Sequence, residues 1–195
     1  DNASQTILGV FTTNPTGVYG APPLAGATGN GVEDWRNTAF RFSSVTIPQG
    51  STISSAKVTF TAFSTRSGFP SYTVAMYCED TDNSADFGAT NNILTRVLTT
   101  ATGNWATPTA QTINVEFDSP SVVSQVQEVI DRSGWVSGNA LMVIFKTTAG
   151  AADDSGPYGD FFADDSTSCA LLTVEYASSV SVGDTDKLSL LGVGN

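Results

Sequence analysis

Histidine is absent from this sequence of 195 residues, and lysine and arginine together number only eight. Without histidine, the chain cannot build a Ser-His-Asp or Cys-His nucleophile system, a histidine-ligated zinc site or a histidine proton shuttle. The eight basic residues stand against 19 acidic ones, which gives a net charge of −11 at pH 7. Because nucleic acids and anionic membranes attract basic surfaces, we expect neither as a partner.

Long apolar runs and cysteines are also scarce. No stretch approaches the ~18 apolar residues that a membrane-spanning helix needs, and the N-terminal residues do not have the pattern of a signal peptide. The two cysteines, Cys78 and Cys169, do not form a Cys-x-x-Cys motif. Two interpretations stay open for them: a disulfide, or two small buried hydrophobic residues.

What the sequence does contain favours short β-strands. Hydrophobic residues make up 40% of the chain and charged residues 14%, a balance that suits strands joined by polar turns. The clearest pattern lies in residues 40–63, where apolar and polar residues alternate after a turn at Pro48, Gln49 and Gly50. We expect this stretch to form a β-hairpin.

Further strands are predicted from apolar residues along the chain, mostly in alternation with polar ones and, at residues 140–146, in an unbroken apolar run typical of a buried strand. The expected ranges are 4–12, 35–42, 72–78, 111–117, 140–146, 159–163 and 170–176. Within 111–117, the alternation of Ile113, Val115 and Phe117 with polar residues indicates one buried face.

One helix is predicted at residues 119–132. Its apolar residues recur at spacings of three and four, namely Val122, Val126, Val129 and Ile130. Ser119 is placed to cap the first turn, and Gly134 to end the helix. Trp135 is expected to pack back onto the rest of the fold.

An acidic segment, residues 79–92, is the first candidate site. Four of its oxygen-bearing side chains fall at alternate positions: Asp80, Asp82, Ser84 and Asp86. Such a series suits a hard cation, so Ca²⁺ is the one cofactor that the sequence suggests. Ala85 replaces the glycine of an EF-hand loop, and Asn91 replaces its final glutamate. The alternative is a solvated acidic turn.

A second candidate site combines aromatic and acidic residues that suit binding of a sugar ring and its hydroxyl groups. Its members are Trp105, Tyr158, Asp160 and Asp164. Trp105 is expected to be exposed, because it lies in a polar segment. Glycoside hydrolysis needs two carboxyl groups held ~5 to 9 Å apart, and no spacing in the sequence indicates this. We therefore expect the protein not to be an enzyme.

Several segments resemble a family when they are taken in order. They are FRFSSVTIPQGSTISSAKVTFTA, YCEDTDNSADF, IDRSGWVSGNALMVIF and LLTVEY, which run from about Trp35 to Tyr176. Together they resemble the jelly-roll modules of the DNRLRE-like, carbohydrate-binding-module-like type. The resemblance implies a β-sandwich of the kind found in bacterial surface proteins and in phage structural proteins.

The expected fold is therefore an all-β jelly-roll sandwich with one short helix and extended terminal arms. Residues 1–34 form an N-terminal strand and a glycine- and proline-rich arm, residues 35–177 the sandwich, and residues 178–195 a C-terminal arm. The C-terminal arm carries apolar residues suited to contact a neighbour: Leu188, Leu190, Leu191 and Val193.

The function expected from these features is that of a non-enzymatic structural protein in a large assembly. A bacteriophage virion component, either a capsid-decorating or a fibre-type surface protein, fits best. Its partners would be neighbouring subunits, either copies of itself or other assembly proteins. The alternative is a secreted or cell-surface carbohydrate-binding module, whose partner is a glycan.

Overall fold

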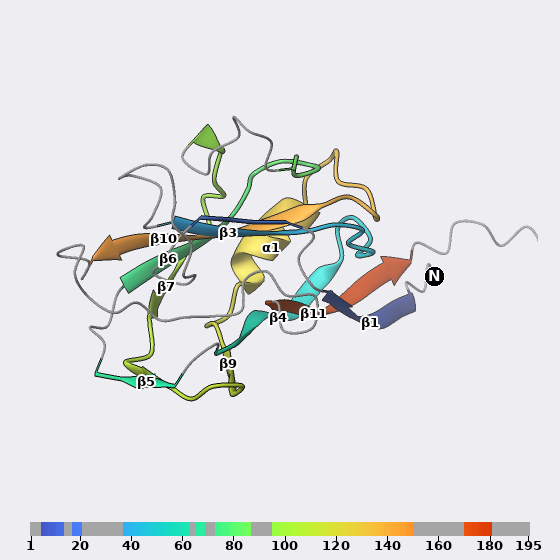
Figure 1. The fold of residues 1–195 in the computed structure, drawn as a ribbon. Helices are drawn as coiled ribbons and strands as arrows, with labels where there is room; N and C mark the ends of the chain where they lie inside the picture. Colours follow the sequence, from blue (N-terminus) through green and yellow to red (C-terminus); the bar gives the residue numbers. More distant parts are fainter. Residues whose placement is uncertain are drawn as a thin grey trace, which may run out of the picture.

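Two antiparallel β-sheets face each other, and a short helix lies between them (Figure 1). The structure is a computed structural model that describes residues 5–13, 17–20, 37–62, 65–68, 73–86, 95–149 and 170–180. The sequence therefore predicted the fold class correctly as an all-β sandwich with a single short helix in the described part of the chain.

The first sheet has four strands in the order β1-β11-β4-β9. Their bounds are Gln5–Thr13, Leu171–Val180, Thr52–Thr61 and Glu116–Asp118. β1 pairs with β11 along its whole length, from Gln5 opposite Val180 to Thr13 opposite Leu172. β11 therefore continues past the boundary predicted at residue 177.

The second sheet has five strands in the order β2-β3-β10-β6-β7. Their bounds are Gly17–Gly20, Asn37–Phe42, Leu141–Ala149, Thr73–Cys78 and Gly103–Ala106. A separate two-stranded ribbon joins β5, Arg66–Ser67, to β8, Ala110–Gln111. The strands predicted at 4–12, 35–42, 72–78, 140–146 and 170–176 correspond to β1, β3, β6, β10 and β11; that at 159–163 lies outside the described residues.

The predicted hairpin at residues 40–63 is wrong in its pairing. The turn itself is present, because the Ser51 N–H donates to the Pro48 carbonyl and Gly50 has a φ of +68°. However, β3 belongs to the five-stranded sheet and β4 to the four-stranded one. The link between them buries Val45 and Ile47. An alternating pattern shows which residues are buried but does not identify the neighbouring strand.

The strand predicted at residues 111–117 is also wrong. Ile113 and Val115 are 48% and 52% exposed, and a turn interrupts the range at Asn114, whose φ is +61°. Asparagine tolerates this left-handed conformation better than most residues. The range therefore enters sheets only at its two ends: Gln111 belongs to β8, and Phe117 lies opposite Phe60 in the four-stranded sheet.

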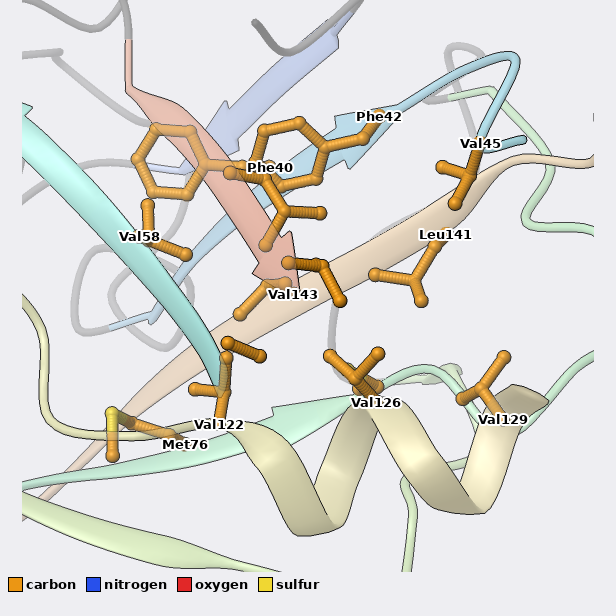
Figure 2. Close-up of a cluster of buried hydrophobic side chains, with 14 of the residues drawn as sticks. Phe40, Phe42, Val45, Val58, Met76, Val122, Val126, Val129, Leu141 and Val143 are labelled. Atoms are coloured by element: carbon orange, nitrogen blue, oxygen red, sulfur yellow. The ribbon is translucent and has the colours of Figure 1, made fainter. Parts of the chain in front are cut away.

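Helix α1 spans Val123–Ile130 and is shorter than predicted. Ser119 does not cap it; the Ser119 hydroxyl accepts a hydrogen bond from the Val58 N–H on β4 instead. The helix ends at the Asp131 cap, before Gly134. Its apolar face is nevertheless as predicted: Val122, Val126, Val129 and Ile130 are buried. Figure 2 shows Val122, Val126 and Val129 directed toward Leu141 and Val143 of β10.

The core is centred on aromatic rings from both sheets. The ring of Phe60 on β4 stacks against Trp105 at 5.7 Å and against Phe117 at 5.7 Å. It also meets Phe40 and Phe145 edge-on, at 5.5 and 5.6 Å between ring centroids. Trp135 packs back as predicted, since it is buried and its indole N–H donates to the Ile47 carbonyl.

Truncating Phe60 to alanine should therefore destabilise the fold by about 3 to 5 kcal/mol, because it leaves a cavity among four aromatic partners. Val136, which is 61% exposed, provides the control: Val136→Ala should change the free energy of unfolding by less than about 0.5 kcal/mol. Urea denaturation of both variants measures the difference, and equal effects would contradict the assignment of Phe60 to the centre of the core.

Candidate functional site

The acidic loop, residues 79–86, follows β6 and lies between two other segments. On one side, the Asp80 N–H donates to the Val97 carbonyl, and Glu79 forms a β-bridge with Leu98. On the other side, the loop contacts the segment after the helix, residues 131–140. The described chain thus brings three stretches that are distant in sequence to one end of the sandwich.

Arg132 binds the two aspartates at the start of the loop. Its guanidinium Nε–H donates to Asp82 Oδ1 at 2.6 Å, and its terminal nitrogen forms an ion pair with Asp80. These interactions, led by the hydrogen bond to Asp82, raise the pKa of Arg132 above its ordinary value. The carboxylates at the first two predicted calcium-ligand positions therefore share one positive charge, which a side chain of the same chain supplies.

Polar contacts hold the backbone of the loop in place. The Asn139 side-chain amide donates to the Asp82 carbonyl at 2.9 Å, and the Ala140 N–H donates to Asn83 Oδ1 at 2.8 Å. The Ser84 N–H returns a bond to the Ala140 carbonyl at 2.9 Å. Residues 82–84 are thus fastened to the start of β10 by three hydrogen bonds, which leaves little freedom for the loop to reshape around a ligand.

Two more arginines, Arg96 and Arg41, bind the acidic loop. Arg96 forms a 2.7 Å ion pair with Glu79, in which both side chains are largely buried. The same guanidinium donates to the carbonyls of Ala85 and Asp86, while Arg41 Nε–H donates to the Ser84 carbonyl at 2.8 Å. A planar guanidinium with five donors suits this multiple role.

The geometry therefore favours an arginine-clamped acidic turn. Asp80, Asp82 and Asp86 are not gathered as metal ligands, and no group of three or more His, Cys, Asp or Glu side chains is placed to hold a metal within the described ranges. Ser84 is buried, and its hydroxyl oxygen has no hydrogen-bond partner among the residues that the structure describes. Calcium binding by these residues stays a prediction that the geometry does not support.

The predicted sugar-binding group loses its first member. Trp105 is buried, with only 6% of its surface exposed, so the expectation that it is exposed is wrong. The physical reason is that Gly103–Ala106 pairs with β6, with Trp105 opposite Val74, and the ring enters the core beside Phe60. The other members, Tyr158, Asp160 and Asp164, lie outside the described residues.

The Cys78 thiol is fully buried. Burial, reinforced by the nearby charge of Glu128, raises its pKa far above the ordinary thiol value. The environment of Cys78 is that of a small buried hydrophobic residue, which was one of the two interpretations; the pairing with Cys169 stays a prediction. Cys169 lies outside the described residues, as do Leu188, Leu190, Leu191 and Val193 of the predicted C-terminal arm.

Sequence reasoning missed the partners of the acidic residues. Arginine is scarce, yet Arg41, Arg96 and Arg132 all converge on one loop. Their scarcity in a chain of net charge −11 was the available signal, because a rare cation is expected beside carboxylates. Their positions in the sequence, spread over three segments, do not reveal that convergence.

Comparisons with known proteins add little. No protein-family model matches the sequence, and no curated protein matches it. One solved structure, described as Desmodium yellow mottle tymovirus, is similar with a TM-score of 0.35 and 12% sequence identity. The match covers 92% of this chain and 91% of that chain, but similarity at this level supports no inference about function. The DNRLRE-like resemblance stays a prediction.

Among the described helices, none has the length and apolar character to cross a bilayer.

Gly134 provides a test of the clamp, because a methyl group there would overlap the Asp82 carboxylate. We expect Gly134→Ala to displace Asp82 from Arg132 and to lower the free energy of unfolding by about 0.5 to 1 kcal/mol, the usual worth of a half-exposed ion pair. In an Asp82→Ala background the same change should be neutral or stabilising, since alanine restricts the unfolded chain. Chemical denaturation of the four proteins measures this coupling, and additive effects would contradict it.

Glu128 links the helix to residues 100–101. Burial raises the pKa of its carboxyl, but this is outweighed by the Thr100 and Ala101 backbone N–H donors, each at 2.8 Å, together with the Thr100 hydroxyl and the Arg132 charge. The resulting pKa lies below the ordinary glutamate value.

Because the folded state holds Glu128 at a lowered pKa, its stabilising contribution is present above the unfolded pKa of about 4.3 and is lost as pH falls through the folded value. We expect wild type to exceed Glu128→Gln in stability at pH 7 and this difference to shrink below about pH 4. Thermal or urea unfolding of both proteins between pH 7 and pH 2.5 checks the direction. A difference that does not change with pH would refute it.

Proposed function

We propose that this protein is a non-enzymatic structural component of a large assembly, of the kind found at a virion surface, and that it docks through its two terminal segments. The observation that carries the proposal is the pairing of β1 with β11. Gln5 lies opposite Val180, so the start of β1 and the end of β11, from which residues 1–4 and 181–195 continue, lie side by side.

This end of the sheet projects past its neighbour. β11 pairs with β4 only over Leu171–Ala177, whereas it pairs with β1 as far as Val180 (Figure 1). The start of β1 and the end of β11 therefore form a two-stranded extension of the sandwich. Fully extended, residues 181–195 reach up to about 50 Å, which is enough to span a neighbouring domain of similar size.

The composition of residues 181–195 suits burial against a partner. Four of the last eight residues have large apolar side chains: Leu188, Leu190, Leu191 and Val193. The acidic loop was the first candidate binding site in the sequence. We assign it a structural role instead, because Asp80, Asp82 and Glu79 form ion pairs with arginines of the same chain. These contacts support a body that positions its ends for binding.

We also propose a jelly-roll arrangement for the eight main strands. Their antiparallel pairs are nested: β6 pairs with β7, β4 with β9, β3 with β10, and β1 with β11. The chain thus behaves as one long hairpin, whose tip is β6–β7, wrapped around a single core. Such closed sandwiches present few exposed edges and serve as rigid building blocks.

Deletion of residues 181–195 tests the proposed docking. The truncation leaves β11 intact at Val180, so we expect a folded protein with unchanged unfolding, but one that no longer joins higher-order particles. Electron microscopy and light scattering of the full chain and the truncated chain, in the source assembly or reconstituted, measure incorporation.

A matched control is Val136→Asp, which changes an exposed apolar residue far from β1 and β11 in sequence. It should incorporate like wild type. Full incorporation of the truncated chain would show that the terminal segment does not dock.

A further inference from the structure

The outer edge of β1 is the longest unpaired strand edge in the described structure. β1 has nine residues, stands at the end of its sheet and is paired on one side by β11. The strands at the other sheet edges are shorter: β2 and β7 have four residues each and β9 has three. A long free edge is a template for another strand, and proteins usually block it with charge, proline or shortness.

β1 carries none of these blocks. Its sequence, QTILGVFTT, contains no charged residue and no proline, in a chain with 27 charged residues (8 basic plus 19 acidic). The opposite edge of the same sheet is protected in the usual way. There, β9 contains Glu116 and Asp118, and Asp118 forms a 2.6 Å ion pair with Lys57.

Backbone alternation shows which β1 groups point outward. The N–H and C=O of Val58 both bond Ser119, on the β9 side of β4. Because successive residues of a strand direct these backbone groups to opposite sides, the N–H and C=O of Lys57 and Thr59 point toward β11. Thr173 lies opposite Lys57 and therefore faces β4.

The same alternation continues through β11. The Glu175 carbonyl accepts a bond from Ser54 of β4, so the residue between, Val174, faces β1. Val174 lies opposite Phe11, which assigns the odd residues of β1 to bonds with β11. The N–H and C=O groups that face outward are those of the even residues, namely Thr6, Leu8, Val10 and Thr12.

We propose that the outer edge of β1 pairs with β1 of a second copy, antiparallel and around a two-fold axis at Gly9. In this register residue i lies opposite residue 18 − i, so Thr6 faces Thr12 and Leu8 faces Val10. All four are outward-facing residues, so each pair exchanges two backbone hydrogen bonds. The two four-stranded sheets become one continuous sheet.

The β1 sequence is matched to itself in this register. Read from either end, it runs polar, threonine, two apolar residues, glycine. Ile7 comes opposite Phe11, a β-branched and aromatic pair, and the threonines come opposite each other; both are favourable cross-strand combinations. A two-fold contact of this kind uses the same patch on both copies, and the uncharged strand lets two chains of net charge −11 meet without local repulsion.

This inference refines the proposed function, on which it rests for the presence of neighbours, by naming a second copy as one of them. It is tested on the purified full chain alone. Loss of the β1 contact would leave docking through residues 181–195 untouched, and failure of that docking would leave the β1 dimer untouched, so the two outcomes are separable.

Gly9→Cys tests the register. Position 9 lies opposite itself as a non-hydrogen-bonded pair with its Cα atoms about 4.5 Å apart, which falls within the span of a disulfide. We expect mild oxidation to link Gly9→Cys into a covalent dimer that reducing agent separates. All proteins in this test carry Cys169→Ser, which removes the other native thiol. Thr13→Cys, opposite Gln5 of the second copy, should then remain unlinked, as should the parent chain, whose Cys78 is buried. Equal linking of both variants, or none, would overturn the register.

A charge pair tests the contact without a thiol. Leu8→Lys with Val10→Lys places like charges opposite each other twice, so the dimer dissociation constant should rise about tenfold or more. Leu8→Lys with Val10→Glu should bring it back toward wild type. The double-lysine variant is less negative overall, so its loss of pairing cannot come from chain-wide repulsion. Sedimentation equilibrium measures all three proteins, and circular dichroism confirms folding. A monomeric wild type, or a dimer insensitive to both variants, would refute the proposal.

Discussion

The packing of Phe60 joins the two sheets, and most of the fold depends on it. Its ring comes from the four-stranded sheet and contacts Phe40, Trp105 and Phe145, all of the five-stranded sheet. These contacts place β3, β7 and β10 opposite β4 across a single hydrophobic layer. Since each buried aromatic side chain removes a large apolar area from water, this cluster sets the spacing on which the loops and the strand edges rely.

Ion pairs and charged hydrogen bonds add a second constraint, outside the core. The protein is strongly acidic, yet three of its five arginines, Arg41, Arg96 and Arg132, bind the acidic loop. The helix adds a contact of the same kind through Glu128, which binds residues 100–101. The acidic loop is therefore held in place by side chains of its own chain.

Local patterns in the sequence predicted local features well. Alternation located β4, β6 and β11, and the three-to-four spacing located the buried face of α1, because both patterns arise from burial of one side of an element. An unbroken apolar run located β10, which is buried on both faces. Pairing could not be obtained in this way. The stretch 40–63 alternates as a hairpin would, but its two strands enter different sheets, since alternation is equally satisfied by either partner.

The candidate sites show the same division. The composition around Trp105 is polar, so its burial could not be foreseen; it results from β7 pairing with β6 and from the space beside Phe60. The acidic series Asp80, Asp82, Ser84 and Asp86 is evident in the sequence, but its arginine partners come from three other segments. Contacts between distant segments depend on the nested strand pairing, which no single stretch of sequence records.

That nested pairing has a consequence for synthesis. β1 is synthesised before its partner β11, which lies more than 150 residues later in the chain. At about 5 to 20 residues per second, β1 waits roughly 10 to 30 s before it has a partner. Throughout that interval an uncharged, proline-free strand is unpaired, and on polysomes similar strands are close by. Correct folding therefore requires that nascent chains be kept apart until their last strand has been made.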